Sequence, residues 1–315
     1  MALARLSSAQ EWVARFGEER KPSVMTIGNF DGIHRGHQEI LRKVTEEARQ
    51  KDQLAAVLTL FPHPLKVLRP AEAPALLMTI GQRLAAFEAA GIDAALVLPF
   101  NLELSRVGPE EFARCYLVET MRASRVLVGE NFRFGHRQEG HVQALENYGR
   151  RWGFEVEIVK SLAINGAVAS STAIREALRD GRVEDAERML GHFFALEGEV
   201  QTGTGQGRKL VVPTLNLSMD QEMLPKKGVY ATETLVGGKA YRSVTNVGVR
   251  PTFDGSRITI ETHLFDFSEN RTSGKMEIRF LRRLRDERKF TGAEELRAQV
   301  LKDIEAAKEF HRQQR

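Results

Sequence analysis

The chain has 315 residues, of which 42% are hydrophobic and 28% charged, the composition of an ordinary globular protein. Its apolar runs are far shorter than the roughly 20 residues of a membrane-spanning helix, which excludes a helical membrane protein and predicts no membrane partner. A single cysteine, Cys115, excludes an internal disulfide and favours a reducing compartment, so we expect a cytoplasmic protein. A chain of this length is expected to hold about two domains.

The net charge of +4 belongs to the second part of the chain, because residues 1–190 hold equal numbers of basic and acidic side chains. The basic excess clusters at 279–290, RFLRRLRDERKF, where acidic residues interrupt it. This pattern suits a phosphate-bearing ligand and predicts no nucleic-acid partner. A nucleic-acid-binding protein remains the alternative from a different class, although its exposed aromatic residues would be interleaved with Lys and Arg.

Up to about residue 190, short apolar runs alternate with amphipathic helical patterns. Helices are expected at 81–91 and at 109–121, the second beginning at Pro109. Apolar strands that alternate with helices predict a parallel sheet covered on both faces, which binds ligands beyond the carboxyl ends of its strands. The expected strands are 24–27, 54–60, 94–98, 125–128 and 154–159.

The first expected strand runs into a glycine-rich turn, GNFDGIHRGH at 28–37, and a helical pattern follows. A strand, such a turn and a helix start present free N–H groups and the positive end of the helix dipole, which suits an anion. His34 and His37 are three residues apart and can lie on one face, where both can donate to phosphate oxygens. The pattern alone leaves open a phosphate site, a metal site that adds Asp31 to the histidines, or a plain turn.

A second anion site is indicated by ASSTAIREAL at 169–178. Ser171 and Thr172 stand at an expected helix start with Arg175 in the first turn, so hydroxyls, N–H groups and a guanidinium converge there. Ordinary N-capping explains this segment equally simply when it is taken alone. The pairing of HxGH with a distant SSTxIR, however, resembles the nucleotidylyltransferase superfamily, whose members transfer an adenylyl or related group.

After a helical pair that ends near residue 190, the pattern changes to strands. Short segments rich in β-branched and aromatic residues follow one another, separated by turn signals and without helices between them. They predict a small antiparallel barrel, followed by a terminal helix over 292–310. The expected domains are therefore 1–190 and 191–315. The expected strands are 196–200, 209–217, 228–236, 240–249, 257–265 and 276–281.

The segment VQTGTGQGRKLVVPTLNL at 200–217 carries several glycines, but a proline-containing strand follows them where a dinucleotide-binding motif needs a helix. We interpret the glycines as a loop that closes over phosphates. Thr214 and Asn216 alternate along the expected strand, and a hydroxyl and an amide at that spacing suit a magnesium ion and phosphate oxygens. Glu261 in IETHLFDF is the carboxylate best placed to accept a hydroxyl proton. Plain sheet surface is the competing interpretation.

Further segments make the resemblance more specific. The GxFDG opening of the first turn, LFPHP at 60–64 and VGENFRFGHRQEG at 128–140 resemble bacterial FAD synthetases. The pattern ending in PTLN, then KKGVYA, NVGVRPTF, IETHLFDF and LRDERKF, resembles the flavokinase module in order and spacing. Nearly the whole chain therefore resembles the bacterial bifunctional riboflavin kinase/FAD synthetase family. One departure is Leu215, which stands where the family usually has alanine.

The resemblance implies an α/β fold: a Rossmann-like nucleotidylyltransferase domain and a six-stranded antiparallel β-barrel with a terminal helix. It implies that ATP phosphorylates riboflavin to FMN in the C-terminal module and adenylylates FMN to FAD, with release of pyrophosphate, in the N-terminal module. Mg²⁺ is the implied cofactor, ATP the co-substrate, and the chain a monomer or weak homo-oligomer. A single-activity adenylyltransferase acting on another cofactor precursor is the nearer alternative.

The resemblance also assigns residues to the two implied sites. Glu261 is the implied catalytic base of the kinase, and His34 and His37 stabilise charge in the adenylyl transfer. In the adenylyltransferase, the implied ATP-binding residues are Gly28, Phe30, Asp31, Gly36, Ser171, Thr172 and Arg175, and the flavin-binding residues are His63, Asn131 and Phe132. In the kinase, the implied phosphate-binding residues are Gly203, Gly207, Arg208, Thr214 and Asn216, the flavin-binding residues are Gly228, Tyr230, Arg285 and Glu287, and the metal ligands are Thr214 and Asn216.

Overall fold

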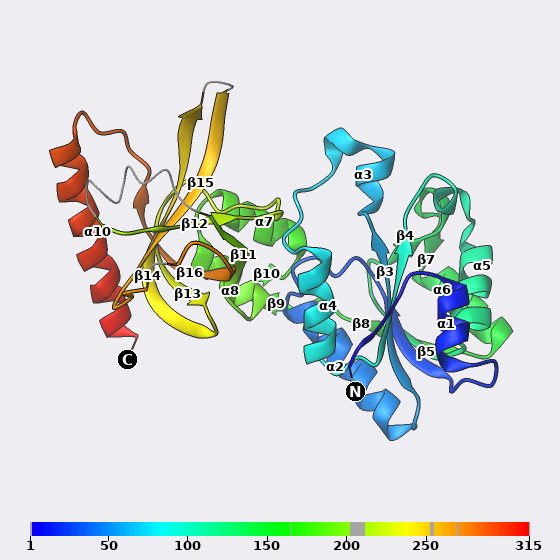
Figure 1. The fold of residues 1–315 in the computed structure, drawn as a ribbon. Helices are drawn as coiled ribbons and strands as arrows, with labels where there is room; N and C mark the ends of the chain where they lie inside the picture. Colours follow the sequence, from blue (N-terminus) through cyan, green and yellow to red (C-terminus); the bar gives the residue numbers. More distant parts are fainter. Residues whose placement is uncertain (1, 165, 202–211, 253–254, 270, 315) are drawn as a thin grey trace. The chain divides into compact units, whose positions relative to one another are not determined.

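The computed structural model describes residues 2–164, 166–201, 212–252, 255–269 and 271–314 (Figure 1). The chain forms two compact units, residues 1–170 and 171–315, and each is presented by itself. Helices α7 (Ser171–Arg179) and α8 (Val183–Leu190) group with the second unit. The expected domain boundary after residue 190 stays a prediction.

The first unit is built on a six-stranded sheet in the order β1-β4-β3-β2-β5-β8. Every neighbouring pair of strands runs parallel, which confirms the predicted parallel sheet. Strand β2 is buried along its whole length, as expected in a sheet covered on both faces. The strands are β1 (Ala4–Leu6), β2 (Ser23–Ile27), β3 (Leu54–Phe61), β4 (Ala94–Pro99), β5 (Ala123–Gly129) and β8 (Glu155–Val159).

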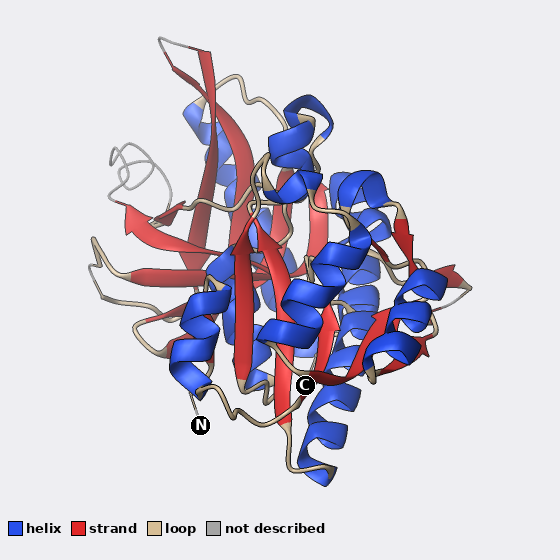
Figure 2. Cartoon of the chain, turned by 90° about the vertical axis from the view of Figure 1, so that its right-hand side faces the viewer, coloured by secondary structure: helices blue, strands red, loops and turns tan. Residues whose placement is uncertain are grey.

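Helices cover both faces of this sheet, and two hydrophobic cores result (Figure 2). One core includes Trp12, Leu117 and Leu145, and the other includes Leu41 and Phe87. The expected helix at 109–121 is present, but only its first turn is α-helical and the rest is a π-helix over Ala113–Thr120. The α-helices are α1 (Ala9–Phe16), α2 (Arg35–Gln50), α3 (Pro64–Leu68), α4 (Ile80–Ala89), α5 (Pro109–Phe112) and α6 (Val142–Trp152).

The remaining elements of the first unit are short. Two small two-stranded sheets pair β6 with β7 and β9 with β10. Among the described residues of the whole chain, no helix is both long and apolar enough to cross a membrane. The short elements are β6 (Arg133–Phe134), β7 (Gly140–His141), β9 (Ala163–Ile164), β10 (Ala167–Val168) and 3₁₀ turns at Pro70–Glu72, Leu104–Arg106 and His136–Gln138.

The second unit contains a closed barrel in the order β11-β12-β15-β14-β13-β16, with helix α10 (Ala293–Gln313) after it (Figure 1). Every neighbouring pair of strands is antiparallel, which confirms the predicted barrel and terminal helix. The strand expected at 209–217 begins only at Leu215 within the described residues. The strands are β11 (Phe194–Gln201), β12 (Leu215–Ser218), β13 (Gly228–Val236), β14 (Lys239–Thr252), β15 (Gly255–Leu264) and β16 (Lys275–Asp286).

Alternation along the strands gives the barrel two distinct faces. Its interior holds hydroxyls that bond to one another: Thr232 Oγ1 lies 2.8 Å from Ser243 Oγ and 2.7 Å from Thr245 Oγ1. Thr262 Oγ1 accepts from Thr245 Oγ1 at 2.9 Å, so these buried polar groups are satisfied. The outer face of the same strands carries apolar side chains that pack against α10. That outer cluster contains Val229, Ala231, Val244, Phe265, Ile304 and Ala307.

Candidate active sites

In the first unit, the strand order reverses beside β2. From β2 the chain moves through β3 to β4 on one side, and β5 then lies on the other side of β2. In open parallel sheets, ligands bind in the crevice beyond the carboxyl ends of the strands at such a reversal. The turn at 28–37 follows β2, and residues 130–132 follow β5. The topology therefore brings two of the predicted segments to one crevice.

The turn after β2 has an uncommon backbone conformation. Phe30, Gly32 and Ile33 have φ angles of 49°, 91° and 43°. Positive φ costs a residue other than glycine about 1–3 kcal/mol and persists only where the surroundings hold it. Here Phe30 and Ile33 are buried in the core beside α2 and α4, and a Cβ at Gly28 would lie 3.2 Å from the Phe30 ring. Packing of the two apolar side chains thus fixes the shape of the turn.

The two predicted catalytic histidines form a stacked pair at the start of α2. The ring centroids of His34 and His37 are 3.7 Å apart at an interplanar angle of 22°. Burial lowers the pKa of His34 to about 4, and burial together with the neighbouring His34 holds the pKa of His37 well below its usual value. Both rings are therefore neutral at pH 7. Within the described residues, neither buried Nδ1 atom has a hydrogen-bond partner.

Gly36 lies between these histidines, and a Cβ there would lie 3.3 Å from the His34 ring. The Phe30 ring packs against His37 with centroids 5.0 Å apart and meets Phe87 edge-on at 5.4 Å. His34 is the N-cap of α2 but makes no side-chain capping bond to that helix. The histidine rings are thus held by stacking and by the core below them. A phosphate at this helix N-terminus would meet two preoriented neutral donors.

Asp31, predicted to bind ATP, is buried and holds backbone of the same unit. Its carboxylate accepts from Leu77 N at 3.0 and 3.1 Å and from Met78 N at 3.1 Å. Burial lowers the pKa of the nearby Arg83, and the Asp31 charge opposes that shift. The described contacts of Asp31 therefore join the turn at 28–37 to the segment that leads into α4.

Arg83 and Asn29 were missed by the sequence analysis. Arg83 is 3% exposed, donates from Nη1 to Asn29 O at 2.8 Å, and lies 5.9 Å from the centre of the Phe61 ring. Asn29 Nδ2 lies 3.3 Å from Nε2 of His63, whose Nδ1 accepts from Leu65 N at 3.2 Å. The predicted flavin residue His63 therefore lies beside the glycine-rich turn. A charged residue within the apolar helical pattern of 81–91 was the available signal for Arg83.

The other predicted flavin residues of this unit follow β5. Asn131 is exposed, and Phe132 is half-buried against the core, stacked on Phe134 with centroids 5.3 Å apart. Phe132 N donates to Gly129 O at 3.0 Å, which turns the chain directly after the strand. An exposed amide and an aromatic ring thus lie at the β5 side of the crevice.

The second predicted anion segment forms a helix start, as expected. Helix α7 begins at Ser171, which is half-buried, while Thr172 is exposed and Arg175 is 7% exposed. This helix belongs to the second unit. The joint action of Ser171, Thr172 and Arg175 with the turn at 28–37 therefore stays a prediction.

In the second unit, one row of side chains crosses the outer face of the barrel. Register pairs Asn216 with Glu261, Glu261 with Asn246, Asn246 with Val229, and Val229 with Arg285. Directly opposed residues of antiparallel strands share a face, so these five side chains lie side by side across five strands. The predicted base is thus flanked by two amides.

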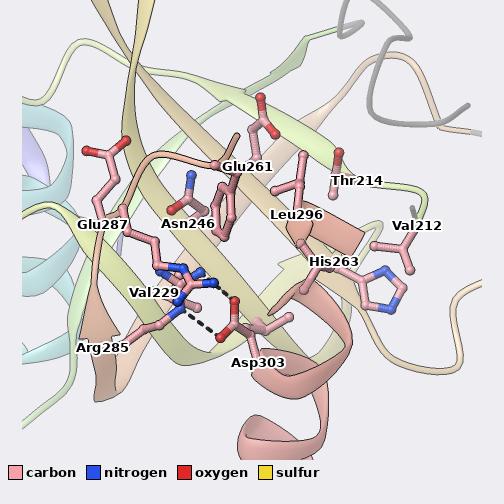
Figure 3. A pocket seen from close by; sticks show the side chains of 14 residues that line it. Val212, Thr214, Val229, Asn246, Glu261, His263, Arg285, Glu287, Leu296 and Asp303 are labelled. Carbon is pink, nitrogen blue, oxygen red and sulfur yellow. Dashed lines mark hydrogen bonds and ion pairs between the residues drawn. The ribbon is translucent and has the colours of Figure 1, made fainter. Parts of the chain in front are cut away.

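This row borders a cavity of about 210 Å³ between the barrel and α10 (Figure 3). Helix α10 contributes Leu296, Val300 and Asp303, and the segment before it contributes Phe290. The walls combine apolar side chains suited to a flat ring with carboxylates, amides and a guanidinium at the edges. The complete lining is Val212, Thr214, Val229, Val244, Asn246, Glu261, His263, Arg285, Glu287, Arg288, Phe290, Leu296, Val300 and Asp303.

Arg285, predicted to bind flavin, is held by a two-pronged ion pair across the cavity wall (Figure 3). Its Nε lies 2.8 Å from Asp303 Oδ1 and its Nη2 lies 2.6 Å from Asp303 Oδ2. Gln299 Nε2 also donates to Asp303 Oδ1 at 2.8 Å. The Asp303 side chain is 8% exposed, and that of Arg285 is 23% exposed. This pair joins β16 to α10 directly beside the apolar walls.

Glu287, also predicted to bind flavin, lines the same cavity. Its Oε1 accepts from Val249 N at 2.9 Å. A Cβ at Gly248 would lie 2.6 Å from that oxygen and 2.8 Å from Asn246 Nδ2, so only glycine leaves room for both groups. The absence of a side chain at 248 lets the Glu287 carboxylate and the Asn246 amide approach each other.

Not every predicted kinase residue borders the cavity. Thr214 does, and Asn216 lies beside Glu261 in register. Tyr230 points into the barrel, where it is fully buried, meets Phe280 edge-on at 5.1 Å and donates its hydroxyl to Lys226 O. Gly228 adjoins Arg285 O, 2.5 Å from where a Cβ would stand. The predicted Gly203, Gly207 and Arg208 lie outside the described residues.

The lining residues missed by the sequence analysis include Asn246, His263 and Asp303. Strand alternation contained the signal for two of them, because Asn246 and His263 must share the outer face with Glu261. Asp303 carried no such signal, since its pairing with Arg285 depends on how α10 packs on the barrel.

Comparison with known proteins gives consistent matches over almost the whole chain. The family model described as FAD synthetase matches residues 17–173, and the one described as riboflavin kinase matches residues 190–311. A protein of Escherichia coli strain K12 named bifunctional riboflavin kinase/FMN adenylyltransferase is 35% identical over 288 residues, covering 91% of this chain and 92% of that protein. Identically named proteins of Haemophilus influenzae and Pseudomonas fluorescens are 35% and 34% identical, each covering 93% of the relative and 91% and 92% of this chain.

A solved structure is similar as well. A crystal structure described as a macrolide-efflux protein from Streptococcus pneumoniae has a TM-score of 0.85 and 28% sequence identity. The similarity covers 98% of this chain and 99% of that one.

Proposed function

Because the chain belongs to the family of bifunctional riboflavin kinase/FMN adenylyltransferases, we propose that its two described sites each catalyse one of the family's two reactions. Riboflavin is phosphorylated to FMN by ATP at the barrel cavity. FMN is then adenylylated to FAD by a second ATP, with release of pyrophosphate, at the crevice beyond β2 and β5. ATP serves both reactions as co-substrate.

The placement of Glu261 carries the kinase assignment. Its carboxylate lies between Asn216 and Asn246 in the row that borders a largely apolar cavity. In our proposal the isoalloxazine ring enters between the barrel and α10, with its edges toward Arg285 and Glu287, and the 5′-hydroxyl reaches Glu261. Glu261 accepts the hydroxyl proton as the oxygen attacks the γ-phosphate of ATP and ADP leaves. A positioned base of this kind contributes about 10²–10⁴-fold to the rate.

The amides beside Glu261 and the nearby hydroxyl have separate tasks in this proposal. Thr214 and Asn216 offer neutral oxygens, the ligand type that suits Mg²⁺ when phosphates supply the remaining charge. Within the described ranges no group of three or more His, Cys, Asp or Glu could hold a metal. Thr214 and Asn216 would hold a magnesium ion, which would neutralise phosphate charge. Asn246 and Glu287 hold polar edges of the flavin.

At the other site, adenylyl transfer needs charge stabilisation and positioning. We assign His34 and His37 to the ATP phosphates, because both rings are neutral and stacked at the start of α2. The FMN phosphate attacks the α-phosphate, and donors near the helix start stabilise charge on the departing pyrophosphate. His63, Asn131 and Phe132 are assigned to FMN, and Asp31 to shaping the turn that cradles ATP. Ser171, Thr172 and Arg175 are assigned to ATP on the resemblance alone.

One incubation tests the proposed function. The purified chain is mixed with riboflavin and Mg-ATP, and the flavins are separated by chromatography over time. We expect FMN to appear first and FAD to follow at its expense. A chain that forms neither product, while its melting curve shows it folded, would contradict the proposal. A salt-sensitive shift of generic RNA in its place would favour a nucleic-acid-binding protein.

A further inference from the structure

His263 has no role in the reactions as described so far, yet it lines the kinase cavity. It lies two residues after Glu261 on β15, and Thr262 between them points into the hydroxyl cluster of the barrel interior. Alternation therefore places His263 and Glu261 on the same outer face. The ring of His263 also meets Phe265, the next residue on that face, at 5.8 Å.

The ring of His263 makes one hydrogen bond with a definite direction. Its Nδ1 lies 2.8 Å from the carbonyl oxygen of Pro213. A carbonyl can only accept, so Nδ1 carries the proton, and this holds whether the imidazole is neutral or charged. In the neutral ring Nε2 is then an acceptor. The hydrogen bond thus fixes both the tautomer and the orientation of the ring.

At Pro213 the hydrogen-bond ladder between β12 and β15 lacks a backbone donor, because proline has no N–H. Within the described residues, strand β12 pairs with β15 through Leu215 opposite Thr262 and Asn216 opposite Glu261. Continued by one residue, this register would place Thr214 opposite His263. Strand β12 nevertheless begins only at Leu215, and Pro213 has no N–H with which to extend the pairing. The His263 side chain binds the Pro213 carbonyl at this point, just before the pairing of β12 with β15 begins. It ties the irregular segment before β12 to the strand that carries Glu261.

We propose that His263 is a positioning residue of the kinase reaction, which holds Thr214 toward the MgATP phosphates through its bond to the Pro213 carbonyl. This inference rests on the proposed kinase function of the cavity. Thr214 follows Pro213 directly, so a shift of the Pro213 peptide moves the Thr214 hydroxyl. Glu261 lies on β15 and Thr214 directly before β12, and His263 sets their separation. Removing a partner that orients a ligand group typically costs about 10–100-fold in affinity or activity.

Two substitutions and a control isolate the hydrogen bond. His263→Ala removes it, whereas His263→Asn places an amide donor at the distance of Nδ1 from the backbone and can restore it. His192 is a matched control, because its exposed ring makes a similar Nδ1 contact to a carbonyl, Phe193 O at 3.0 Å, and it does not line the cavity. Conversion of added FMN to FAD reports on the other site in every variant.

We expect His263→Ala to raise KM for MgATP about 10- to 100-fold in FMN formation and to weaken Mg-ADP binding in calorimetry by a similar factor. KM for riboflavin should change less than threefold. His263→Asn should recover most of both losses, and His192→Ala should match the unaltered chain. Because the proton on Nδ1 is retained in both charge states, the pH profile of His263→Asn should follow that of the unaltered chain.

Several results would overturn the inference. Unchanged MgATP KM and Mg-ADP affinity in His263→Ala would show that the bond positions nothing. A change in riboflavin KM alone would make His263 a flavin contact, and a pH optimum displaced in His263→Asn would make its ring a proton carrier. If His263→Ala does not fold, the test relies on His263→Asn. A folded His263→Asn variant that binds MgATP much more weakly than the unaltered chain would refute the role of the hydrogen bond. If the unaltered chain itself makes no FMN, the proposed kinase function fails instead.

Discussion

The ion pair between Arg285 and Asp303 is expected to hold α10 against the barrel and so to form one wall of the cavity. Replacing Asp303 by alanine leaves the Arg285 guanidinium beside the cavity without its carboxylate and leaves Gln299 without its acceptor. Breaking a fully buried pair by removing one partner costs about 3–5 kcal/mol. Since the Arg285 side chain is 23% exposed and water can solvate it, we expect a smaller loss, about 2–3 kcal/mol.

Thermal unfolding measures this loss. In a unit of this size each kcal/mol lowers Tm by about 2–4 °C, so Asp303→Ala should lower the Tm of the second unit by roughly 4–12 °C. Asp303→Asn keeps one acceptor and should lose about half as much. KM for riboflavin should rise in both variants, because Arg285 and α10 border the ring site. Lys308 and Glu305 form an exposed pair on the same helix at 3.1 Å, so Glu305→Ala is the control and should change stability by less than about 1 kcal/mol.

The reasoning is refuted if Asp303→Ala melts at the same temperature as Glu305→Ala. In that case the pair does not hold α10, whatever its geometry. An unchanged riboflavin KM with a lowered Tm would separate the two parts of the argument: the pair would stabilise the fold without shaping the flavin wall.

Three further predictions concern the two sites. The pKa of His34 is about 4 in the folded chain and about 6.5 in the unfolded chain, so the unfolded chain binds the proton first as pH falls. The free energy of unfolding should therefore decrease between pH 6.5 and pH 4, by about 3 kcal/mol at most. His34→Asn should therefore show a shallower fall of Tm between pH 7 and 4.5, and an equally steep fall would contradict the burial of that ring. Gly36→Ala should lower the rate of FAD formation about 10-fold or more by displacing the His34 ring, measured with added FMN, while a normal rate would show that the ring's place is not critical. Thr214→Ala should raise the Mg²⁺ concentration for half-maximal FMN formation, whereas Thr214→Ser should not; equal behaviour of the two would remove the hydroxyl from the metal site.

The order of helices and strands could be predicted because hydrophobic residues are spaced differently in the two halves of the chain. Largely apolar strands such as β2 are buried on both faces, whereas side chains of segments such as β13 alternate between the inside and the outside of a barrel. The site residues that were predicted stand in local patterns: the turn at 28–37, the Thr214 and Asn216 alternation, and Glu261. These patterns depend on neighbours in the chain, and a single sequence displays them.

What was missed depends on contacts between distant segments. Arg83 reaches Asn29 from α4, Asp303 reaches Arg285 from α10, and His263 reaches Pro213 from β15. No periodicity in the sequence specifies which of many charged or polar side chains finds such a partner. Tyr230 was named as a flavin contact because of its sequence motif, but strand alternation places its ring inside the barrel.

The central claim is that two separate sites carry the two reactions, and product analysis of Glu261→Ala and His34→Ala tests it directly. With riboflavin and Mg-ATP, we expect Glu261→Ala to lose FMN formation by about 10²-fold or more, yet to convert added FMN to FAD normally. His34→Ala should accumulate FMN without forming FAD. An equal mixture of the two variants should then produce FAD from riboflavin, because FMN released by one is used by the other. Loss of both activities in either variant, with its melting curve unchanged, would contradict the two-site account.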